Sequence, residues 1–140
     1  MSVYLDTSAI TAALTQETQT ARMQAWLGEQ AIGALFISEW VVTEFSSALA
    51  KKHRMKELTS EKYAETLKTW RSLREISFNI LPVTTAHFKA AAALLDATDL
   101  NLRAGDALHL AIAADHKLRL LTLDTRMAEA AEAIGVAVAV

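Results

Sequence analysis

The sequence contains no cysteine, which excludes disulfide bridges, thiolate metal ligands and a cysteine nucleophile and is compatible with the cytosol. It has one proline and four glycines, so no Pro/Gly-rich linker marks a domain boundary. Long hydrophobic runs are also missing. None reaches the ~20 residues that span a bilayer, and Asp6 interrupts the first one, so no signal peptide is expected. These absences predict a single cytoplasmic domain over residues 1–140.

An excess of positive charge is missing too, since the formal net charge is −2. An acidic balance argues against a nucleic-acid partner, because phosphate binding favours basic surfaces. The charges are unevenly distributed, however, and a local basic cluster contains Lys51, Lys52 and Arg54. Two interpretations of this cluster stay open: contacts to nucleic-acid phosphates, and a solvated helix end where cations stabilise the helix dipole.

Short apolar runs alternate with longer helical patterns along the chain. Strands are predicted at residues 3–5, 35–37, 79–83, 119–123 and 136–140. Helices are predicted at residues 7–14, 18–30, 39–54, 60–76, 85–97, 105–116 and 126–134, with a left-handed Gly135 ending the last one. Strands separated by helices need crossover connections. The predicted fold class is therefore α/β: a single-domain α/β/α sandwich with a mainly parallel central sheet.

Two acidic residues directly follow predicted strands, Asp6 after the first and Asp124 after the fourth. In a parallel α/β sheet, ligands bind beyond the carboxyl ends of the strands. Both residues are therefore candidates for a site at that edge. Each also suits an ordinary helix N-cap, and this alternative stays open for either residue taken alone.

Two further carboxylates lie in helical patterns. At 100° per residue, Glu44 falls inside the apolar sector of its helix, where an unpaired carboxylate is costly to bury. Asp106 opens a helix that is apolar nearly all round and is therefore predicted to be covered. The alternatives are a Glu at the rim of the apolar face and another first-turn cap. If all four acids converge, their repulsion favours a cation, and an all-oxygen ligand set favours Mg²⁺ or Mn²⁺ over Zn²⁺.

The order of these residues resembles the PIN-domain ribonucleases, and specifically the VapC-like toxins of type II toxin–antitoxin systems. Four segments carry the resemblance, and together they extend over nearly the whole chain, from residue 3 to about residue 138. The third is the most specific. The segments are YLDTSA at residues 4–9, SEWVVTEF at 38–45, LRAGDALHLA at 102–111 and LTLD at 121–124.

This resemblance implies a PIN-like fold and an acidic Mg²⁺ or Mn²⁺ site formed by Asp6, Glu44, Asp106 and Asp124. It implies endoribonuclease activity, in which a metal-activated water hydrolyses RNA phosphodiester bonds. It also implies inhibition by a cognate VapB-like antitoxin and frequent homodimers, with no role for a membrane.

Several other polar residues are secondary candidates. Ser8 and Thr122 would orient a carboxylate or a bound water, with helix capping and β-propensity as the alternatives. Arg103 would contact phosphate, or else is a solvated residue before a helix. His109 neighbours Asp106 on its helix and is interpreted as a hydrogen-bonded core histidine. No ligand spacing relates the other histidines, which are His53, His87 and His116.

Two other classes of function stay open. An α/β phosphotransfer domain also has an acidic strand-end pocket. Receiver domains, however, use a Lys after a late strand, whereas Arg126 follows Asp124 here. A haloacid-dehalogenase-like phosphatase would want a second Asp where Ser8 stands. A non-catalytic or regulatory PIN-like binding module would be favoured by the loss of one acidic residue, and all four are present.

Overall fold

A parallel sheet forms the centre of the fold in the computed structural model, which describes residues 2–97 and 99–139. In this part of the chain four strands lie in the order β3-β2-β1-β4, and every pairing is parallel. The carboxyl ends of the strands therefore meet at one edge, and the predicted mainly parallel α/β fold is confirmed. The strands are β1 Val3–Leu5, β2 Leu35–Ser38, β3 Asn79–Leu81 and β4 Arg119–Leu121.

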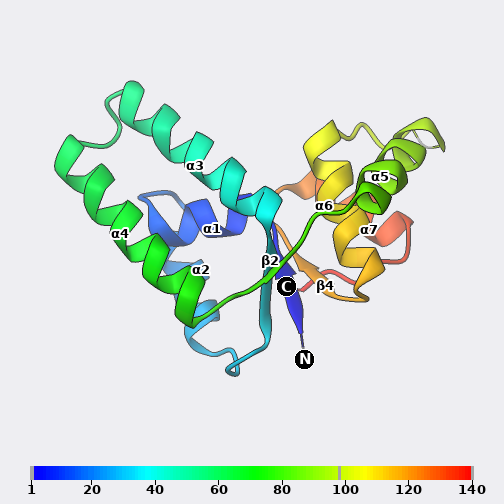
Figure 1. The fold of residues 1–140 in the computed structure, drawn as a ribbon, viewed down its shortest axis with the longest axis horizontal. Helices are drawn as coiled ribbons and strands as arrows, with labels where there is room; N and C mark the ends of the chain where they lie inside the picture. Colours follow the sequence, from blue (N-terminus) through cyan, green and yellow to red (C-terminus); the bar gives the residue numbers. More distant parts are fainter. Residues whose placement is uncertain (1, 98, 140) are drawn as a thin grey trace.

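Helices flank the sheet on both sides (Figure 1). Helices α1 to α4 lie on one side, where α3 and α4 form a long hairpin, and α5 to α7 lie on the other. None of the described helices is long and apolar enough to cross a membrane. Their bounds are α1 Thr7–Leu14, α2 Thr20–Gly28, α3 Glu39–Arg54, α4 Ser60–Ile76, α5 Thr85–Ala97, α6 Ala104–Asp115 and α7 Thr125–Ala133.

Side-chain caps fix the starts of several helices. Asp6 before α1, Ser38 before α3 and Thr59 before α4 each accept a hydrogen bond from a backbone N–H of the first turn. Gly135, after α7, has a φ of +86°, the left-handed conformation predicted for it. The predicted bounds of α1, α3, α4 and α5 agree with the structure, because these signals are local.

The predicted last strand is wrong in extent. In place of a strand at residues 136–140, the structure has one parallel bridge between Leu120 and Val138, and Val140 lies outside the described residues. Leu120 donates to the carbonyl of Ala137 and accepts from the amide of Ala139, each at 2.8 Å. In the described chain, Leu120 is therefore the one residue of β4 whose backbone pairs with the C-terminal segment.

Three other elements are shorter than predicted, for local reasons. Strand β3 stops before Pro82, which has no N–H for the ladder. Strand β4 stops before Thr122, whose hydroxyl turns to the carboxylate of Asp6. Helix α2 begins at Thr20 rather than residue 18, because the hydroxyl of Thr20 accepts from the Glu17 amide at 2.8 Å and closes a turn there.

Helix α6 is the central helix of its side, since it contacts β4 and also packs against α5. Its residues 107–113 are all buried, as the apolar pattern on every side predicts. Strand β1 is buried over its full length between β2 and β4. Asp6 directly follows β1, and Asp106 and His109 lie on α6, so these two elements position part of the candidate site.

Candidate functional site

Asp6 lies at the carboxyl end of β1, with its side chain only 3% exposed. Its oxygen Oδ1 accepts hydrogen bonds from the Ser8 hydroxyl at 2.7 Å and the Ala9 amide at 3.2 Å. Its oxygen Oδ2 accepts from the Thr122 hydroxyl at 2.5 Å. Burial raises the pKa of Asp6, while nearby His109 and the hydrogen bonds lower it to a smaller extent. Asp6 is therefore a carboxylate held by neutral donors in a dry environment.

The hydroxyls on Asp6 also tie it to the chain beyond β4. Ser8 accepts from the backbone amide of Leu123 at 3.0 Å, and Thr122 accepts from the amide of Asp124 at 3.0 Å. Each hydroxyl thus donates to the carboxylate and accepts from the segment after the strand. This geometry orients Asp6 and joins two segments that lie more than a hundred residues apart in sequence.

Glu44 is the second carboxylate at this end of the sheet, on the second turn of α3, with its side chain 30% exposed. Its oxygen Oε1 accepts from the Thr7 hydroxyl at 2.6 Å and from His109 Nε2 at 2.5 Å. Burial alone would raise the pKa of Glu44, but the hydrogen bond and charge of His109, with the Thr7 hydroxyl, lower it overall. Glu44 is therefore held in its ionised form.

A buried polar chain behind Glu44 links it to β1 and β2. The Tyr4 hydroxyl lies 2.7 Å from His109 Nδ1 and 2.8 Å from Ser38 Oγ. Burial raises the pKa of Tyr4 far above its usual range, and the charges of Asp6 and Glu44 raise it further, so the phenol stays protonated. The His109 ring therefore lies between Tyr4 and Glu44, with one hydrogen bond at each of its two nitrogens.

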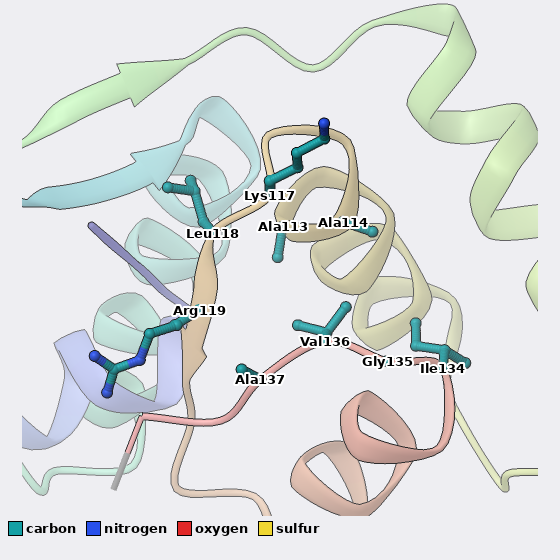
Figure 2. Close-up of a pocket in the computed structure, with 9 residues that line it drawn as sticks. All are labelled: Ala113, Ala114, Lys117, Leu118, Arg119, Ile134, Gly135, Val136 and Ala137. Atoms are coloured by element: carbon teal, nitrogen blue, oxygen red, sulfur yellow. The ribbon is translucent and has the colours of Figure 1, made fainter. Parts of the chain in front are cut away.

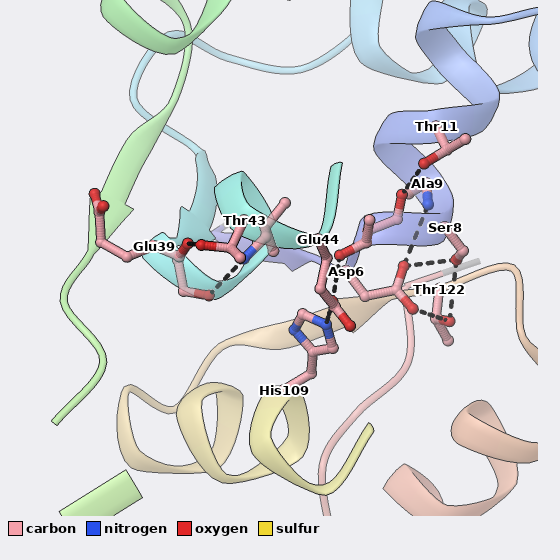
Figure 3. A network of polar contacts seen from close by, with 12 residues as sticks. Asp6, Ser8, Ala9, Thr11, Glu39, Thr43, Glu44, His109 and Thr122 are labelled. Carbon is pink, nitrogen blue, oxygen red and sulfur yellow. Dashed lines mark hydrogen bonds and ion pairs between the residues drawn. The ribbon is translucent and has the colours of Figure 1, made fainter. Parts of the chain in front are cut away.

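Asp6, Glu44 and His109 thus form one group at the carboxyl edge of the sheet (Figure 3). His109 is the hydrogen-bonded core histidine expected from the sequence, but its bond to Glu44 could not be foreseen. The hydrogen bonds of Tyr4 to Ser38 and His109 could not be foreseen either. The sequence indicated only that a buried tyrosine hydroxyl needs a hydrogen-bond partner.

Asp106 lies in the first turn of α6, where its oxygen Oδ2 accepts from the backbone amide of Arg103 at 3.3 Å. The preceding residue, Gly105, brings this helix end against α3. A Cβ at Gly105 would lie 3.0 Å from Glu44 Oε2 and 3.4 Å from Trp40 Nε1. The close approach places the Asp106 backbone beside Glu44. No hydrogen bond within the described residues joins the Asp106 side chain to Asp6 or Glu44.

Asp124 follows β4, which is paired directly with β1. Its oxygen Oδ1 accepts from the amides of Arg126 at 2.9 Å and Met127 at 3.4 Å, so it caps α7. It reaches Asp6 only indirectly, through its backbone amide and Thr122. The fold therefore brings Asp6 and Glu44 around one histidine, with Asp106 and Asp124 at the ends of flanking helices.

The basic candidates lie further along α3. Lys51, Lys52 and Arg54 are in its last turn, and Lys51 is seven residues beyond Glu44, about 10 Å along the helix axis. Lys52 pairs with Glu17 at 3.0 Å. Arg103 is nearer to the carboxylates, because its amide binds Asp106.

A different group of side chains has closely spaced ligand atoms. Within residues 2–97 and 99–139, His87, Asp115 and His116 are the one set of three or more acidic or histidine side chains with ligand atoms within 4.8 Å of one another. No sequence spacing relates these histidines, because tertiary packing of α5 on α6 brings them together. His87 Nδ1 accepts from the Thr84 amide at 3.0 Å, and its Nε2 lies 2.8 Å from Asp115.

Through these bonds His87 joins the start of α5 to the end of α6. With Nδ1 occupied as an acceptor, the neutral ring carries its proton on Nε2 and donates it to Asp115, leaving no lone pair for a metal ion. The hydrogen bond from His87 is the largest cause of the lowered pKa of Asp115.

A pocket of about 380 Å³ lies at the amino end of β4, away from the candidate site at the carboxyl edge of the sheet (Figure 2). Its lining contains no carboxylate side chain.

Comparison with known proteins places the chain in a family. The model of the PIN domain family matches residues 3–133. Among solved structures, FitAcB from Neisseria gonorrhoeae has a TM-score of 0.72 and 25% identity, covering 97% of this chain and 95% of that one. VapC20 from Mycobacterium tuberculosis, a toxin that cleaves the sarcin-ricin loop, has a TM-score of 0.74 and 15% identity, covering 96% of each chain.

A toxin–antitoxin complex from Klebsiella pneumoniae has a TM-score of 0.69 and 20% identity, covering 99% of this chain and 97% of that one. No curated protein matches the sequence. The family model extends over all four acidic candidates and the whole sheet, so the chain belongs to the PIN domain family.

Proposed function

We propose that this chain is a Mg²⁺- or Mn²⁺-dependent endoribonuclease and the toxin component of a toxin–antitoxin pair. The observation that carries the proposal is the pair of carboxylates, Asp6 and Glu44, held by dedicated donors around His109 at the ligand edge of a parallel sheet. Membership of the PIN domain family supports it. So does the structural likeness to VapC20, which cleaves the sarcin-ricin loop.

The donor set of this edge fits a hard divalent cation. Asp6, Glu44, Asp106 and Asp124 offer only carboxylate oxygens, which suit Mg²⁺ and Mn²⁺ better than Zn²⁺. Their oxygens are not gathered into a tight group in the described chain. Mg²⁺ tolerates such spacing, because it usually keeps several waters and takes only one or two carboxylates directly.

When bound, the metal would lower the pKa of a water and stabilise the charge that develops on the phosphate. The protein's own groups would supply orientation and a proton acceptor. Ser8 and Thr122 hold Asp6 in one orientation, and Thr7 and His109 do the same for Glu44. A carboxylate that does not bind the metal would accept the proton of the attacking water. The expected products carry a 5′-phosphate and a 3′-hydroxyl, because the attacking water would form the new P–O bond and the bond from phosphorus to O3′ would break, with the proton going to the leaving oxygen.

Substrate and partners follow from the same proposal. Arg103, beside Asp106, would contact a phosphate near the scissile bond, and the basic end of α3 (Lys51, Lys52 and Arg54) would contact the RNA further along. The likeness to the toxin–antitoxin complex from Klebsiella pneumoniae supports an antitoxin as a partner, which we expect to be VapB-like. A homodimer and a cytoplasmic location are also expected.

An RNase assay on the purified chain tests the proposal, with total cellular RNA as the probe. Cleavage is expected with Mg²⁺ or Mn²⁺, and it should stop when EDTA is added. Asp6→Asn should lower cleavage by at least about a hundredfold, since it removes a charged ligand. Glu39→Gln, an exposed acid at the start of α3, is the matched control and should stay active.

Equal cleavage by wild type and Asp6→Asn would defeat the nuclease assignment. A wild type that cleaves no RNA and is harmless when expressed without its antitoxin would favour the alternative, a non-catalytic PIN-like binding module. An α/β phosphotransfer domain would instead be favoured by a stable phosphoryl group on Asp6 after incubation with a phosphate donor.

A further inference from the structure

An apolar pocket of about 230 Å³ lies where α5, the start of α6 and the first turn of α3 come together. Two aromatic side chains line it, Trp40 from α3 and Phe88 from α5. Phe88 is 56% exposed and Trp40 is half-buried, so solvent reaches both side chains. Alanine, glycine and leucine form the rest of the wall. The pocket is therefore open to a ligand and has aromatic rings at its wall.

Gly105 connects this pocket to the candidate site. It lines the pocket, and a Cβ at this position would lie 3.0 Å from Glu44 Oε2 and 3.4 Å from Trp40 Nε1. Asp106, another of the acidic candidates, is the next residue of α6. A molecule held at these carboxylates therefore has the pocket directly beside it.

The pocket suits a flat, weakly polar group better than a charged one. Its lining consists of Ala, Gly, Leu, Phe and Trp, and the indole N–H of Trp40 is covered and has no hydrogen-bond partner within the described residues. A charged group would therefore lose its hydration there without gaining a hydrogen bond. An aromatic ring would instead gain stacking or edge contacts with Phe88 and Trp40. Because pockets for drug-sized ligands measure about 300–1,000 Å³, this smaller volume suits a single ring system.

A basic residue adjoins the same pocket. Arg103 directly precedes Ala104 of the pocket wall, and its side chain is exposed. A cation, an acidic site and an aromatic pocket therefore lie next to one another. These features correspond to the parts of an RNA strand that a nuclease must hold: a neighbouring phosphate, the phosphate that is cleaved, and a base. The pocket at the amino end of β4 lacks this combination, since its lining has no aromatic side chain.

We infer that the pocket between Trp40 and Phe88 binds one unpaired base of the RNA strand, next to the phosphate that is cleaved. Proteins hold unpaired bases by stacking them on aromatic side chains, whereas a base inside a duplex has both faces covered. Stacking accepts any base, and the lining offers no hydrogen bond to a base edge, so the pocket selects unpaired RNA rather than a sequence. The inference rests on the proposed function and adds the substrate class, an RNA loop or single strand.

Binding of short RNA oligonucleotides, followed by fluorescence polarisation, tests the inference. The full chain carries Asp6→Asn, which is expected to slow cleavage, and Mg²⁺ is present. In a series of oligonucleotides, one nucleotide after another lacks its base. One such abasic position should weaken binding by at least about fivefold, because the stacking of one base is lost. The intact oligonucleotide annealed to its complement should also bind more weakly than the single strand.

Phe88→Ala identifies the side chain that holds this base. Because Phe88 is 56% exposed, its removal should leave the thermal midpoint unchanged. The variant should bind the intact oligonucleotide at least about fivefold more weakly, and the critical abasic position should then have no further effect. Phe88→Trp, which keeps a ring, should bind like the chain with Phe88. Ile76→Ala, which shortens an 80% exposed side chain at the end of α4, is the matched control.

Three results would overturn the inference: oligonucleotides that tolerate every abasic position, unchanged RNA binding by Phe88→Ala, or Phe88→Ala and abasic effects that simply add. Unchanged RNA binding together with altered sedimentation of Phe88→Ala would assign the pocket to a protein contact instead. Cleavage by the chain with Asp6 intact, measured separately with Mg²⁺ or Mn²⁺, reports on the nuclease. If that chain cleaves no RNA while the base and Phe88 effects appear, the nuclease proposal fails and the base pocket stands.

Discussion

Asp6 occupies a position that is unfavourable for an ionised group. Burial raises its pKa, and the opposing effects of His109, Ser8 and Thr122 are smaller. The folded chain therefore binds the Asp6 proton more tightly than the unfolded chain does. The stability contributed by this group is fully present below its unfolded-state pKa and is lost as the pH rises through its folded-state pKa. Such a charge, kept at the expense of stability, is typical of functional sites.

Replacing Asp6 by Asn should stabilise the metal-free protein. In EDTA near neutral pH, Asp6→Asn should raise the free energy of unfolding by roughly 1 kcal/mol, because it removes a buried charge and keeps the shape. Urea unfolding at several pH values measures the effect. The difference from wild type should shrink as the pH falls, since Asp6 is then protonated. A wild type more stable than the variant at neutral pH would contradict the prediction.

His109 is expected to act by positioning Glu44. His109→Leu removes a donor from Glu44 and leaves Tyr4 without its partner on the ring, so Mn²⁺ affinity and RNA cleavage should each fall about 10- to 100-fold. His109→Gln, which keeps a donor, should lose less. Electron paramagnetic resonance of bound Mn²⁺ gives the affinity independently of cleavage. His116→Leu, at the exposed end of α6, is the control, and equal Mn²⁺ affinities in wild type and His109→Leu would rule the role out.

At the scale of elements, the sequence was most informative where structure is decided locally. Asp6, Ser38 and Thr59 mark helix starts by themselves, and the alternation of strands and helices predicts a parallel sheet. The predictions fail where the end of an element depends on contacts with residues distant in sequence. The end of β4 depends on Thr122 turning to Asp6, and the C-terminal segment pairs through Leu120 alone.

The same limit applies to the candidate site. The placement of Asp6 and Asp124 at strand ends follows from the topology, and the apolar stripe around Glu44 points to its burial. The bond between His109 and Glu44 depends on how α6 packs against α3, which no local pattern specifies. The grouping of His87 with His116 has the same origin, since it needs α5 to lie on α6.

The junction of α6 with α3 supplies a prediction of its own. Gly105→Ala would place a Cβ 3.0 Å from Glu44 Oε2, and the flexible carboxylate would move rather than the helices. Alanine favours helix by about 1 kcal/mol over glycine, so the thermal midpoint should hold or rise while cleavage falls about tenfold. Gly28→Ala on α2, where no atom lies within 4 Å, is the matched control for both measurements. A Gly105→Ala protein with full activity would show that Glu44 tolerates displacement.

At the scale of the whole molecule, the two sides of the sheet contribute different parts. The side with α1 and α3 carries Thr7 and Glu44, and the side with α6 and α7 carries His109 and adjoins Asp124. The two contributions come together beside Asp6, because β1 lies between β2 and β4 in the sheet.

The strand order also has a consequence for synthesis. Strand β1 emerges first from the ribosome, yet its neighbour β4 and the hydroxyl of Thr122 emerge more than a hundred residues later. Until then β1 has one open edge, and Asp6 lacks one of its donors. A nascent chain therefore cannot complete the candidate site while most of it is still being translated. For the proposed ribonuclease, this delay would protect the message and the ribosome that produce the chain.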